Sequence, residues 1–325
     1  MNRRTLLLSS LAASTVFGIG DVQSTPKVAH LGWLTAQRSA SLLPFLEAFR
    51  EGLRELGYRE GETLDIQYRY GDDDINRVAS LGFELARKPV DVLVVQGAAV
   101  PLVFQLRLPV PSVYVFSGDP VRAGLAETLS RPLGNMTGLT FMAAELNSKR
   151  VEMASEIVPD LREIAIISNT EHPGSEIERT YSEEAARKLG LGVRFFSTTT
   201  KVELTTALRM LEERPAQAIL LFADGFAIQY RNEIIHSGMR QRTPVISGWP
   251  VFAQSGAICT YGPKLSDCYG RLAYYADRIL KGSQPSDLPI ERPSKFETVV
   301  NLKTARALGF NIPQSLIVSA DELIE

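Results

Sequence analysis

Two aspartates stand where a reactive pair of carboxylates would be sought. Asp119 and Asp224 each follow a short apolar run that is typical of a buried strand. Two carboxylates held close together support general acid–base hydrolysis. An aspartate that ends a strand before proline or glycine more commonly caps a turn or a helix, and contact with a ligand or between lobes is the second alternative. The sequence favours these two interpretations over catalysis.

Other catalytic and metal-binding patterns are missing from the sequence. It contains no serine nucleophile elbow, no phosphate-binding P-loop and no dinucleotide-binding G-x-G-x-x-G motif after the first strand. The three histidines, His30, His172 and His236, are scattered and form no metal-ligand cluster with the two cysteines. We therefore predict a protein that is not an enzyme and that requires no metal and no cofactor.

The two cysteines, Cys259 and Cys268, are nine positions apart. They can pair if the protein works in an oxidising compartment. Cys259 lies at the end of a predicted strand and Cys268 in a predicted helix, and spacing alone does not bring their side chains together. Two separate buried thiols are the favoured alternative.

Strands and helices alternate along most of the chain, which is typical of a parallel α/β fold. The run 90–95 is apolar throughout, as in a strand covered on both faces, whereas 63–70 alternates strictly and indicates a half-buried strand near a sheet edge. The predicted strands are 27–34, 63–70, 90–95, 113–116, 163–168, 193–197, 216–222, 244–247, 257–261 and 296–301. The main predicted helices are 41–56, 75–88, 144–158, 174–189, 202–214, 227–238, 264–282 and 303–309.

The two halves of the chain repeat the same β-α-β order, and 325 residues exceed the usual size of one hydrophobic core. We predict an α/β fold of two Rossmann-like, doubly wound lobes with parallel sheets, joined by a hinge. The strand at 113–116 stops at Ser117-Gly118-Asp119-Pro120, and the lobe boundary is placed there. The expected division is a leader at 1–25, one lobe from 26–118 and about 250–295, and a second from 119–249 and about 296–325.

Ligands of doubly wound sheets bind beyond the carboxyl ends of the strands. Asn169-Thr170 either offers backbone N–H groups to an anion or caps the next helix, and the aromatic residues either line an apolar cleft or belong to the core. The predicted ligand-binding residues are Thr35, Gln37, Ser39, Gln96, Gly97, Ala98, Ser117, Asp119, Asn169, Thr170, Asp224, Phe226, Trp249 and Tyr261.

The N-terminus indicates export. Asn2-Arg3-Arg4 precedes an uncharged apolar run, 5–20, that is short and rich in serine, alanine and glycine, as in a signal peptide. The segment RRTLL at its start resembles a twin-arginine signal without the usual downstream lysine. We predict a periplasmic protein, with cleavage between residues 20 and 25. The formal net charge of −2 argues against a nucleic-acid partner, and a monomer is expected.

Four segments together resemble one family, in order and across nearly the whole chain after the leader. They are AFREGLRELGYREGETLDIQYRYGDDD (48–74), GDPVRAGL (118–125), RPLGNMTGLT (131–140) and the tail 295–325. The chain resembles the ABC-transporter substrate-binding proteins of type I periplasmic-binding-protein fold, a family that includes tryptophan-binding members. The resemblance implies three hinge crossings, capture of a small molecule by hinge closure, and delivery to an ABC permease in the inner membrane.

The resemblance also implies roles for particular residues. Asp119 matches the family's G-D-P strand exit, Asn169 its asparagine after the crossing, and Asp224 its acidic residue after the central strand of the second lobe. The chain departs from the family at Gln96-Gly97-Ala98-Ala99, where relatives often have a glycine pair followed by Thr-Pro. Because Ala98 has no hydroxyl to donate, this departure argues against tryptophan as the ligand. An amino acid or an aromatic or other organic acid is expected.

Three other functions share parts of this pattern. A ligand sensor that partners a membrane signalling receptor needs the same cleft and the same export, and it remains the alternative function. A transcriptional repressor needs an N-terminal DNA-reading helix pair, where this chain has an apolar leader. An enzyme on this fold would reveal itself by turnover of a bound molecule.

Overall fold

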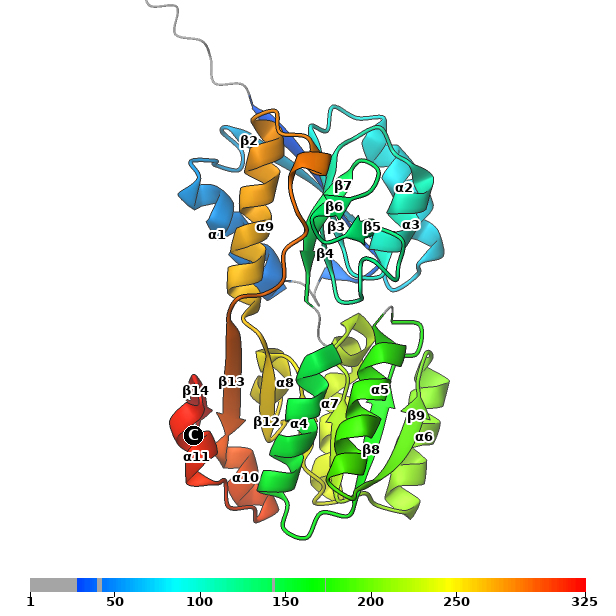
Figure 1. The fold of residues 1–325 in the computed structure, drawn as a ribbon, viewed down its shortest axis with the longest axis vertical. Coiled ribbons are helices and arrows are strands. Elements are labelled where there is room, and N and C mark those ends of the chain that lie inside the picture. Colours follow the sequence, from blue (N-terminus) through cyan, green and yellow to red (C-terminus); the bar gives the residue numbers. More distant parts are fainter. Residues whose placement is uncertain (1–27, 40–42, 142–143, 173) are drawn as a thin grey trace, which may run out of the picture.

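The computed structural model describes residues 28–39, 43–141, 144–172 and 174–325. The predicted leader and the proposed cleavage site lie outside these residues. The described chain forms two α/β lobes, one above the other in Figure 1, each with its own sheet. This confirms the predicted fold class.

In lobe 1, five parallel strands form a sheet in the order β2-β1-β3-β4-β7. Side chains alternate between its faces, as strand geometry requires: Trp33 packs towards α1 and α9, and Leu34 towards α2 and α3. As predicted, the alternating segment β2 lies at the edge. The elements are β1 (Ala29–Thr35), α1 (Leu43–Glu55), β2 (Leu64–Tyr70), α2 (Asn76–Ala86), β3 (Val92–Gln96), α3 (Ala99–Leu106), β4 (Ser112–Phe116), β5 (Ala126–Thr128), β6 (Arg131–Pro132), β7 (Met136–Thr140), α9 (Leu265–Leu280) and the 3-10 helix η2 (Pro285–Asp287).

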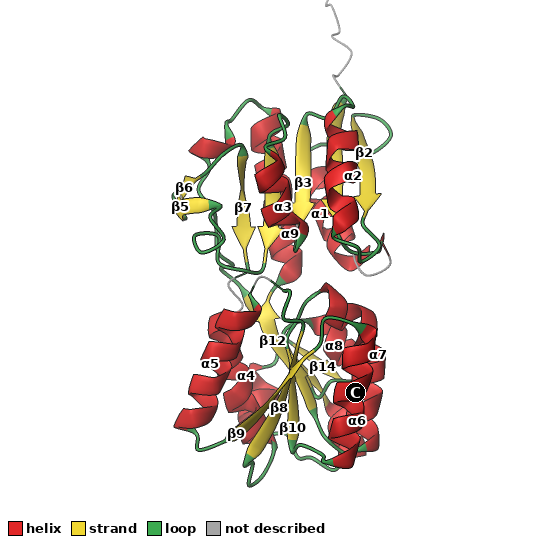
Figure 2. Cartoon of the chain, turned by 90° about the vertical axis from the view of Figure 1, so that its right-hand side faces the viewer, coloured by secondary structure: helices red, strands yellow, loops and turns green. Residues whose placement is uncertain are grey.

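Lobe 2 has seven strands in the order β14-β13-β12-β11-β10-β8-β9, and only the β12–β13 pair is antiparallel. Helices cover both faces (Figure 2): Ile164 and Ile166 pack with α4 and α5, and Ala165 and Ile167 with α6 and α7. The elements are α4 (Ala144–Ile157), β8 (Glu163–Ser168), α5 (Ser175–Lys188), β9 (Gly192–Ser197), α6 (Lys201–Glu213), β10 (Ala218–Leu221), α7 (Gly225–Arg240), β11 (Val245–Ser247), α8 (Pro250–Gln254), β12 (Cys259–Pro263), β13 (Phe296–Asn301), α10 (Leu302–Leu308), α11 (Gln314–Ser319) and β14 (Glu322–Ile324).

The strand pairing corrects the expected lobe boundary in two places. The chain does not leave lobe 1 at residue 118, because β7 pairs with β4 from Ser112↔Met136 to Phe116↔Thr140. It passes to lobe 2 only between β7 and α4. Likewise, α8 and β12 were expected in lobe 1, but β12 pairs with β11 in the second sheet. The other two passages lie between β12 and α9 and between η2 and β13 (Figure 1).

Candidate ligand-binding site

A cavity of about 430 Å³ lies between the two lobes. It sits beyond the carboxyl ends of β1, β3 and β4 in lobe 1 and of β8 and β10 in lobe 2, the position where doubly wound sheets bind ligands. Its described lining residues are Ala36, Gln37, Phe45, Asp73, Ile75, Gln96, Gly97, Ala98, Pro101, Val115, Ser117, Phe141, Asn169, Glu171, His172, Thr199, Asp224, Gly225, Phe226, Ile228, Gln229, Trp249, Leu265 and Tyr269.

Asp224 is the central polar residue of the lobe 2 wall. It follows β10 and caps α7, where its Oδ1 accepts a hydrogen bond from the backbone N–H of Ala227 at 2.7 Å. Its Oδ2 accepts from Asn169 Nδ2 at 2.8 Å. Asn169 Oδ1 in turn accepts from the backbone N–H of Glu171 at 3.0 Å. The carboxylate is thus held rigidly by two donors and still has lone pairs for a third.

Burial sets the electrostatics of this carboxylate. Asp224 is buried, and desolvation raises its pKa above the usual value, while His172, the Ala227 amide and Asn169 act in the opposite direction. A positively charged ligand group would favour the ionised form in the same way that a cationic side chain does. The wall is therefore suited to a cation or another strong donor.

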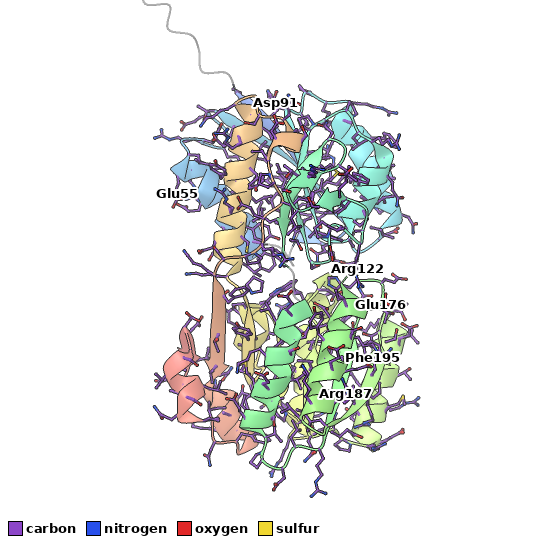
Figure 3. The ribbon with its side chains drawn as sticks, viewed as in Figure 1. Glu55, Asp91, Arg122, Glu176, Arg187 and Phe195 are labelled. Atoms are coloured by element: carbon purple, nitrogen blue, oxygen red, sulfur yellow. The ribbon has the colours of Figure 1, made fainter. Side chains whose placement is uncertain are left out.

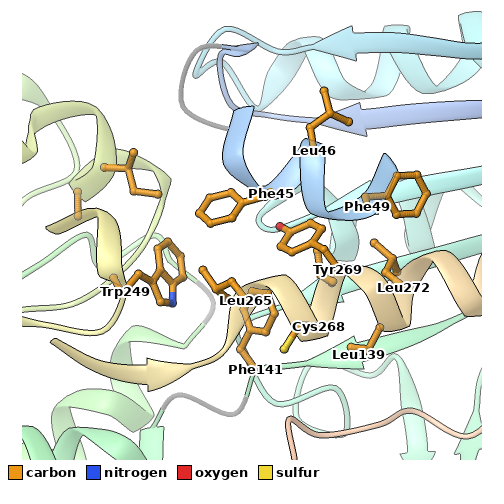
Figure 4. Packing of buried hydrophobic residues seen from close by; sticks show 14 of the residues in the cluster. Phe45, Leu46, Phe49, Leu139, Phe141, Trp249, Leu265, Cys268, Tyr269 and Leu272 are labelled. Atoms are coloured by element: carbon orange, nitrogen blue, oxygen red, sulfur yellow. The ribbon is translucent and has the colours of Figure 1, made fainter. Parts of the chain in front are cut away.

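Four aromatic residues form one wall of the cavity. Phe45, Phe141 and Tyr269 of lobe 1 lie together on one side of Trp249 of lobe 2 (Figure 4). The Phe45 ring stacks on Tyr269 with centroids 5.4 Å apart, and it meets Trp249 edge-on at 6.0 Å. The Phe141 ring meets Trp249 edge-on at 6.4 Å. Such contacts favour planar, partly apolar ligands, with Phe226 adding another ring on α7.

The polar side chains that lobe 1 contributes to the cavity are mostly neutral. Gln96 ends β3, and the following Gly97 and Ala98 lead into α3, whose N-terminus has no side-chain cap. Four buried polar atoms of lining residues have no hydrogen-bond partner among the described residues: Gln37 Oε1, Gln96 Oε1, His172 Nε2 and Trp249 Nε1. Because buried polar atoms are nearly always paired in native proteins, these atoms are candidates for contact with a ligand.

The charges around the cavity are acidic. None of the described lining residues is a lysine or an arginine, whereas Asp73, Glu171 and Asp224 all line it. Asp73 is already paired, with its Oδ2 2.7 Å from Arg38 Nε. The unbalanced buried charge is therefore that of Asp224.

Behind Asp224, a buried polar network supports the lobe 2 wall. His172 Nε2 lies 4.0 Å from Glu178 Oε2, and both side chains are buried. The fully buried Arg150 donates from Nε to the carbonyl of Tyr261 at 2.8 Å and from Nη1 to Asn147 Oδ1 at 2.5 Å. Burial raises the pKa of Glu178 and lowers that of Arg150 to about 10, and the attraction between the two charges opposes both shifts.

Nine of the fourteen predicted site residues line the cavity. They are Gln37, Gln96, Gly97, Ala98, Ser117, Asn169, Asp224, Phe226 and Trp249. All of them lie at strand ends or in the segments that follow, up to the first turn of the next helix, which is the rule by which they were chosen. Their contact with a ligand remains a prediction.

The other five, Thr35, Ser39, Asp119, Thr170 and Tyr261, do not line the cavity. Ser39 is exposed. Three of these side chains hold local structure instead: Thr35 Oγ1 accepts from the Gln37 N–H at 3.2 Å, Asp119 Oδ1 from the Val121 N–H at 2.8 Å, and Thr170 Oγ1 contacts Ser197 Oγ at 2.7 Å. The Tyr261 ring packs on Phe296, with centroids 6.3 Å apart.

Sequence reasoning missed the aromatic residues of lobe 1. Phe45 and Tyr269 lie near the starts of α1 and α9, and Phe141 directly follows β7. The first turn of a helix that follows a strand exit lies at the same edge of the sheet, and this rule would have included Phe45. The return of α9 to lobe 1 was predicted, but Tyr269 lies in the second turn of that helix and not at a strand end, so the rule did not select it.

The described residues contain no group of three or more histidine, cysteine, aspartate and glutamate side chains placed to hold a metal ion. Cys259 and Cys268 are both free and buried, which confirms the favoured alternative of two separate thiols. In the part of the chain that the structure describes, no helix has the length and apolar character needed to cross a lipid bilayer.

Known proteins resemble this chain in sequence and in fold. A tyrosine-binding protein of Clostridioides difficile (strain R20291) is 20% identical over 264 residues, covering 81% of this chain and 75% of that protein. A conserved domain protein from Vibrio cholerae superimposes with a TM-score of 0.84 at 22% identity, covering 91% of this chain and all of that one. An ABC domain from Streptococcus pneumonia in complex with L-Trp gives a TM-score of 0.83 at 21% identity, covering 92% and 100% of the two chains.

These structural likenesses confirm the type I periplasmic-binding-protein fold. A family model for the ABC transporter substrate binding protein family matches residues 38–324, which is most of the sequence. The chain belongs to the family of ABC transporter substrate-binding proteins.

Proposed function

We propose that this protein is the binding component of an ABC importer and that it captures an aromatic amino acid between its lobes. One observation carries the proposal: the cavity combines a buried carboxylate, Asp224, with an aromatic wall and has no lysine or arginine among its described lining residues. This narrows the predicted ligands from amino acids and organic acids to molecules that carry an ammonium group.

The two head groups of an amino acid have complementary positions in the cavity. The ammonium group donates to Asp224, which has lone pairs to spare beyond its bonds to Ala227 and Asn169. The carboxylate faces the uncapped N-terminus of α3, where backbone N–H groups and the helix dipole favour an anion. Ala98 offers only its backbone there.

The side chain of the ligand lies against the aromatic wall. Phe45, Phe141, Trp249 and Tyr269 present ring faces and edges to the cavity, and stacked or edge-on ring pairs each contribute about 0.5–1.5 kcal/mol beyond area burial. A volume of about 430 Å³ lies within the usual range of small-molecule sites. The names of two similar proteins, one tyrosine-binding and one in complex with L-Trp, support an aromatic ligand.

Capture involves closure of the lobes about the three connecting passages, and the closed protein delivers its ligand to a membrane permease outside the cytoplasm. The N-terminal basic and apolar segment supports export. Arg122 of lobe 1 and Glu176 of lobe 2 lie on the facing ends of the lobes (Figure 3), and this opposite charge supports a closed state.

The ligand class is tested by thermal unfolding of protein that has been unfolded, stripped and refolded. L-tyrosine, L-tryptophan and L-phenylalanine are compared with tyramine, which lacks the carboxylate, and 3-(4-hydroxyphenyl)propionate, which lacks the ammonium group. At a hundredfold excess over its dissociation constant, a ligand stabilises the folded state by about 2.7 kcal/mol. We expect such stabilisation from an intact amino acid and much less from both analogues. Equal stabilisation by the propionate would contradict the proposed contact between Asp224 and the ammonium group of the ligand.

The importer role is tested by uptake of the labelled amino acid in cells with and without the gene. We expect uptake to fall when the gene is deleted. Unchanged uptake together with a lost signalling response to the same ligand would replace the importer with the sensor alternative.

A further inference from the structure

Two glycines of lobe 2 lie directly against lobe 1. A methyl group placed on Gly225, the first residue of α7, would lie 1.6 Å from Gln37 Nε2, 2.5 Å from Cδ and 2.8 Å from Cγ. One placed on Gly174, the N-cap of α5, would lie 3.2 Å from the Ser117 carbonyl oxygen. At Gly225, therefore, only a hydrogen atom fits while Gln37 holds its position.

The backbone does not require glycine at position 225. Its φ is outside the left-handed region, and it is the first helical residue after the Asp224 cap. Alanine is the better helix former, and glycine in a helix is unfavourable because it loses more conformational freedom on folding. The reason for glycine at this position is therefore the space that it leaves for Gln37.

Gln37 reaches across from the opposite lobe. It follows β1, and its backbone N–H is fixed by a 3.2 Å hydrogen bond to Thr35 Oγ1. Its side chain lines the cavity together with Asp224, and its Oε1 is buried without a hydrogen-bond partner among the described residues. The carboxamide thus lies over the N-terminus of α7, next to the carboxylate assigned to the ligand.

We propose that Gln37 is a positioning residue for ligand binding and that its side chain packs on the bare backbone of Gly225. In this account, which rests on the proposed function, closure brings the lobe 1 carboxamide onto the bare backbone of Gly225. Its oxygen then accepts from the ligand beside Asp224, so that closure and recognition occur together. A side chain at position 225 would hold the lobes apart. Turning only the carboxamide aside would not relieve this, because Cγ is also within 2.8 Å of the added methyl group.

The test is a double-mutant cycle of Gly225→Ala and Gln37→Ala, titrated with L-tyrosine and L-tryptophan. Overpacking at a well-packed contact predicts that Gly225→Ala weakens binding about five- to a hundredfold. Gln37→Ala weakens it by a smaller factor, through loss of one acceptor. In the double variant, the penalty of Gly225→Ala disappears, because the truncated residue no longer meets the methyl group. Additive losses would overturn the proposal, as would unchanged affinity in Gly225→Ala.

Gly270→Ala is the matched control, because a methyl group at this position of α9 meets no atom within 4 Å. It should leave affinity unchanged. Gly225→Ala should leave the melting temperature of the empty protein unchanged or slightly higher, which separates blocked closure from misfolding. A lower melting temperature together with weak binding in both backgrounds would overturn the proposal.

Scattering by the empty protein provides a readout that is independent of the ligand. Because a methyl group at position 225 would collide with Gln37 in the arrangement of the lobes described here, Gly225→Ala should disfavour this arrangement and increase the radius of gyration, and the double variant should restore it. If the wild type binds no probe, the proposed ligand class is wrong. The packing of Gln37 on Gly225 is then tested by scattering alone, and equal radii of gyration in all variants would overturn it.

Discussion

Replacing Asp224 by asparagine tests whether its charge binds the ligand. Asparagine has nearly the shape of aspartate and is an equally good helix N-cap, so the bond from the Ala227 N–H, 2.7 Å in the wild type, is kept. The negative charge is removed. In the wild type Asn169 Nδ2 donates to Asp224 Oδ2 at 2.8 Å; in the variant the new amide nitrogen faces this donor, so one hydrogen bond within the wall is lost.

The magnitude follows from the contact that is lost. A hydrogen bond to a charged group is worth about 1.5–3 kcal/mol, which corresponds to a dissociation constant about ten- to a hundredfold higher. Folding stability should change much less, because the lost bond to Asn169 is offset by relief from burying a carboxylate whose pKa burial raises. We therefore expect this variant to bind the ligand more weakly while its folding stability stays nearly unchanged.

Tryptophan fluorescence is a suitable assay. The sequence has two tryptophans, and one of them, Trp249, lines the cavity. Selective excitation of tryptophan during titration with L-tyrosine then reports binding directly. Asp73→Asn removes the same charge at a lining residue already paired with Arg38, and we expect it to change affinity much less. Equal effects of the two substitutions, or full affinity in Asp224→Asn, would refute the reasoning.

Three further predictions concern titration and stability. Because burial raises the pKa of Asp224 and the ligand requires its ionised form, affinity should fall as pH is lowered from about 8 to about 4, and Asp224→Asn should lose this dependence. Arg150→Met removes a buried cation that attracts Glu178 and breaks the hydrogen bonds from Arg150 to the Tyr261 carbonyl and to Asn147, which should cost about 3–5 kcal/mol and lower the melting temperature by about 10 °C in calorimetry; an unchanged transition would contradict this. Burial raises the pKa of the Cys259 and Cys268 thiols to about 12, so iodoacetamide should label them only after denaturation, as mass spectrometry can check.

Local sequence signals predicted most of the fold. The bounds of β8 and β13 match the prediction, because apolar runs flanked by polar residues define strands without reference to the rest of the chain. The lobe boundary was wrong because membership of a sheet depends on a distant partner. Nothing within Met136–Thr140 indicates that it pairs with β4, and the break at 117–120 is a turn within lobe 1, stabilised by Asp119.

The site was predictable to the extent that parallel strands end at one edge of a sheet. This rule brought Gln96, Asn169 and Asp224 to the cavity. It could not distinguish a strand-exit side chain that faces the cleft from one that caps its own turn, as Thr35 and Asp119 do. That distinction depends on the orientation of each turn, which is fixed only by the assembled lobes.

The most direct test of the account is calorimetric titration of the stripped, refolded protein with L-tyrosine, L-tryptophan and L-phenylalanine in turn. We expect at least one of them to bind with one molecule per chain and a dissociation constant of about 1 μM or lower, equivalent to about −8 kcal/mol. An absence of binding heat with all three, at several temperatures, would contradict the central claim that the cavity holds an aromatic amino acid.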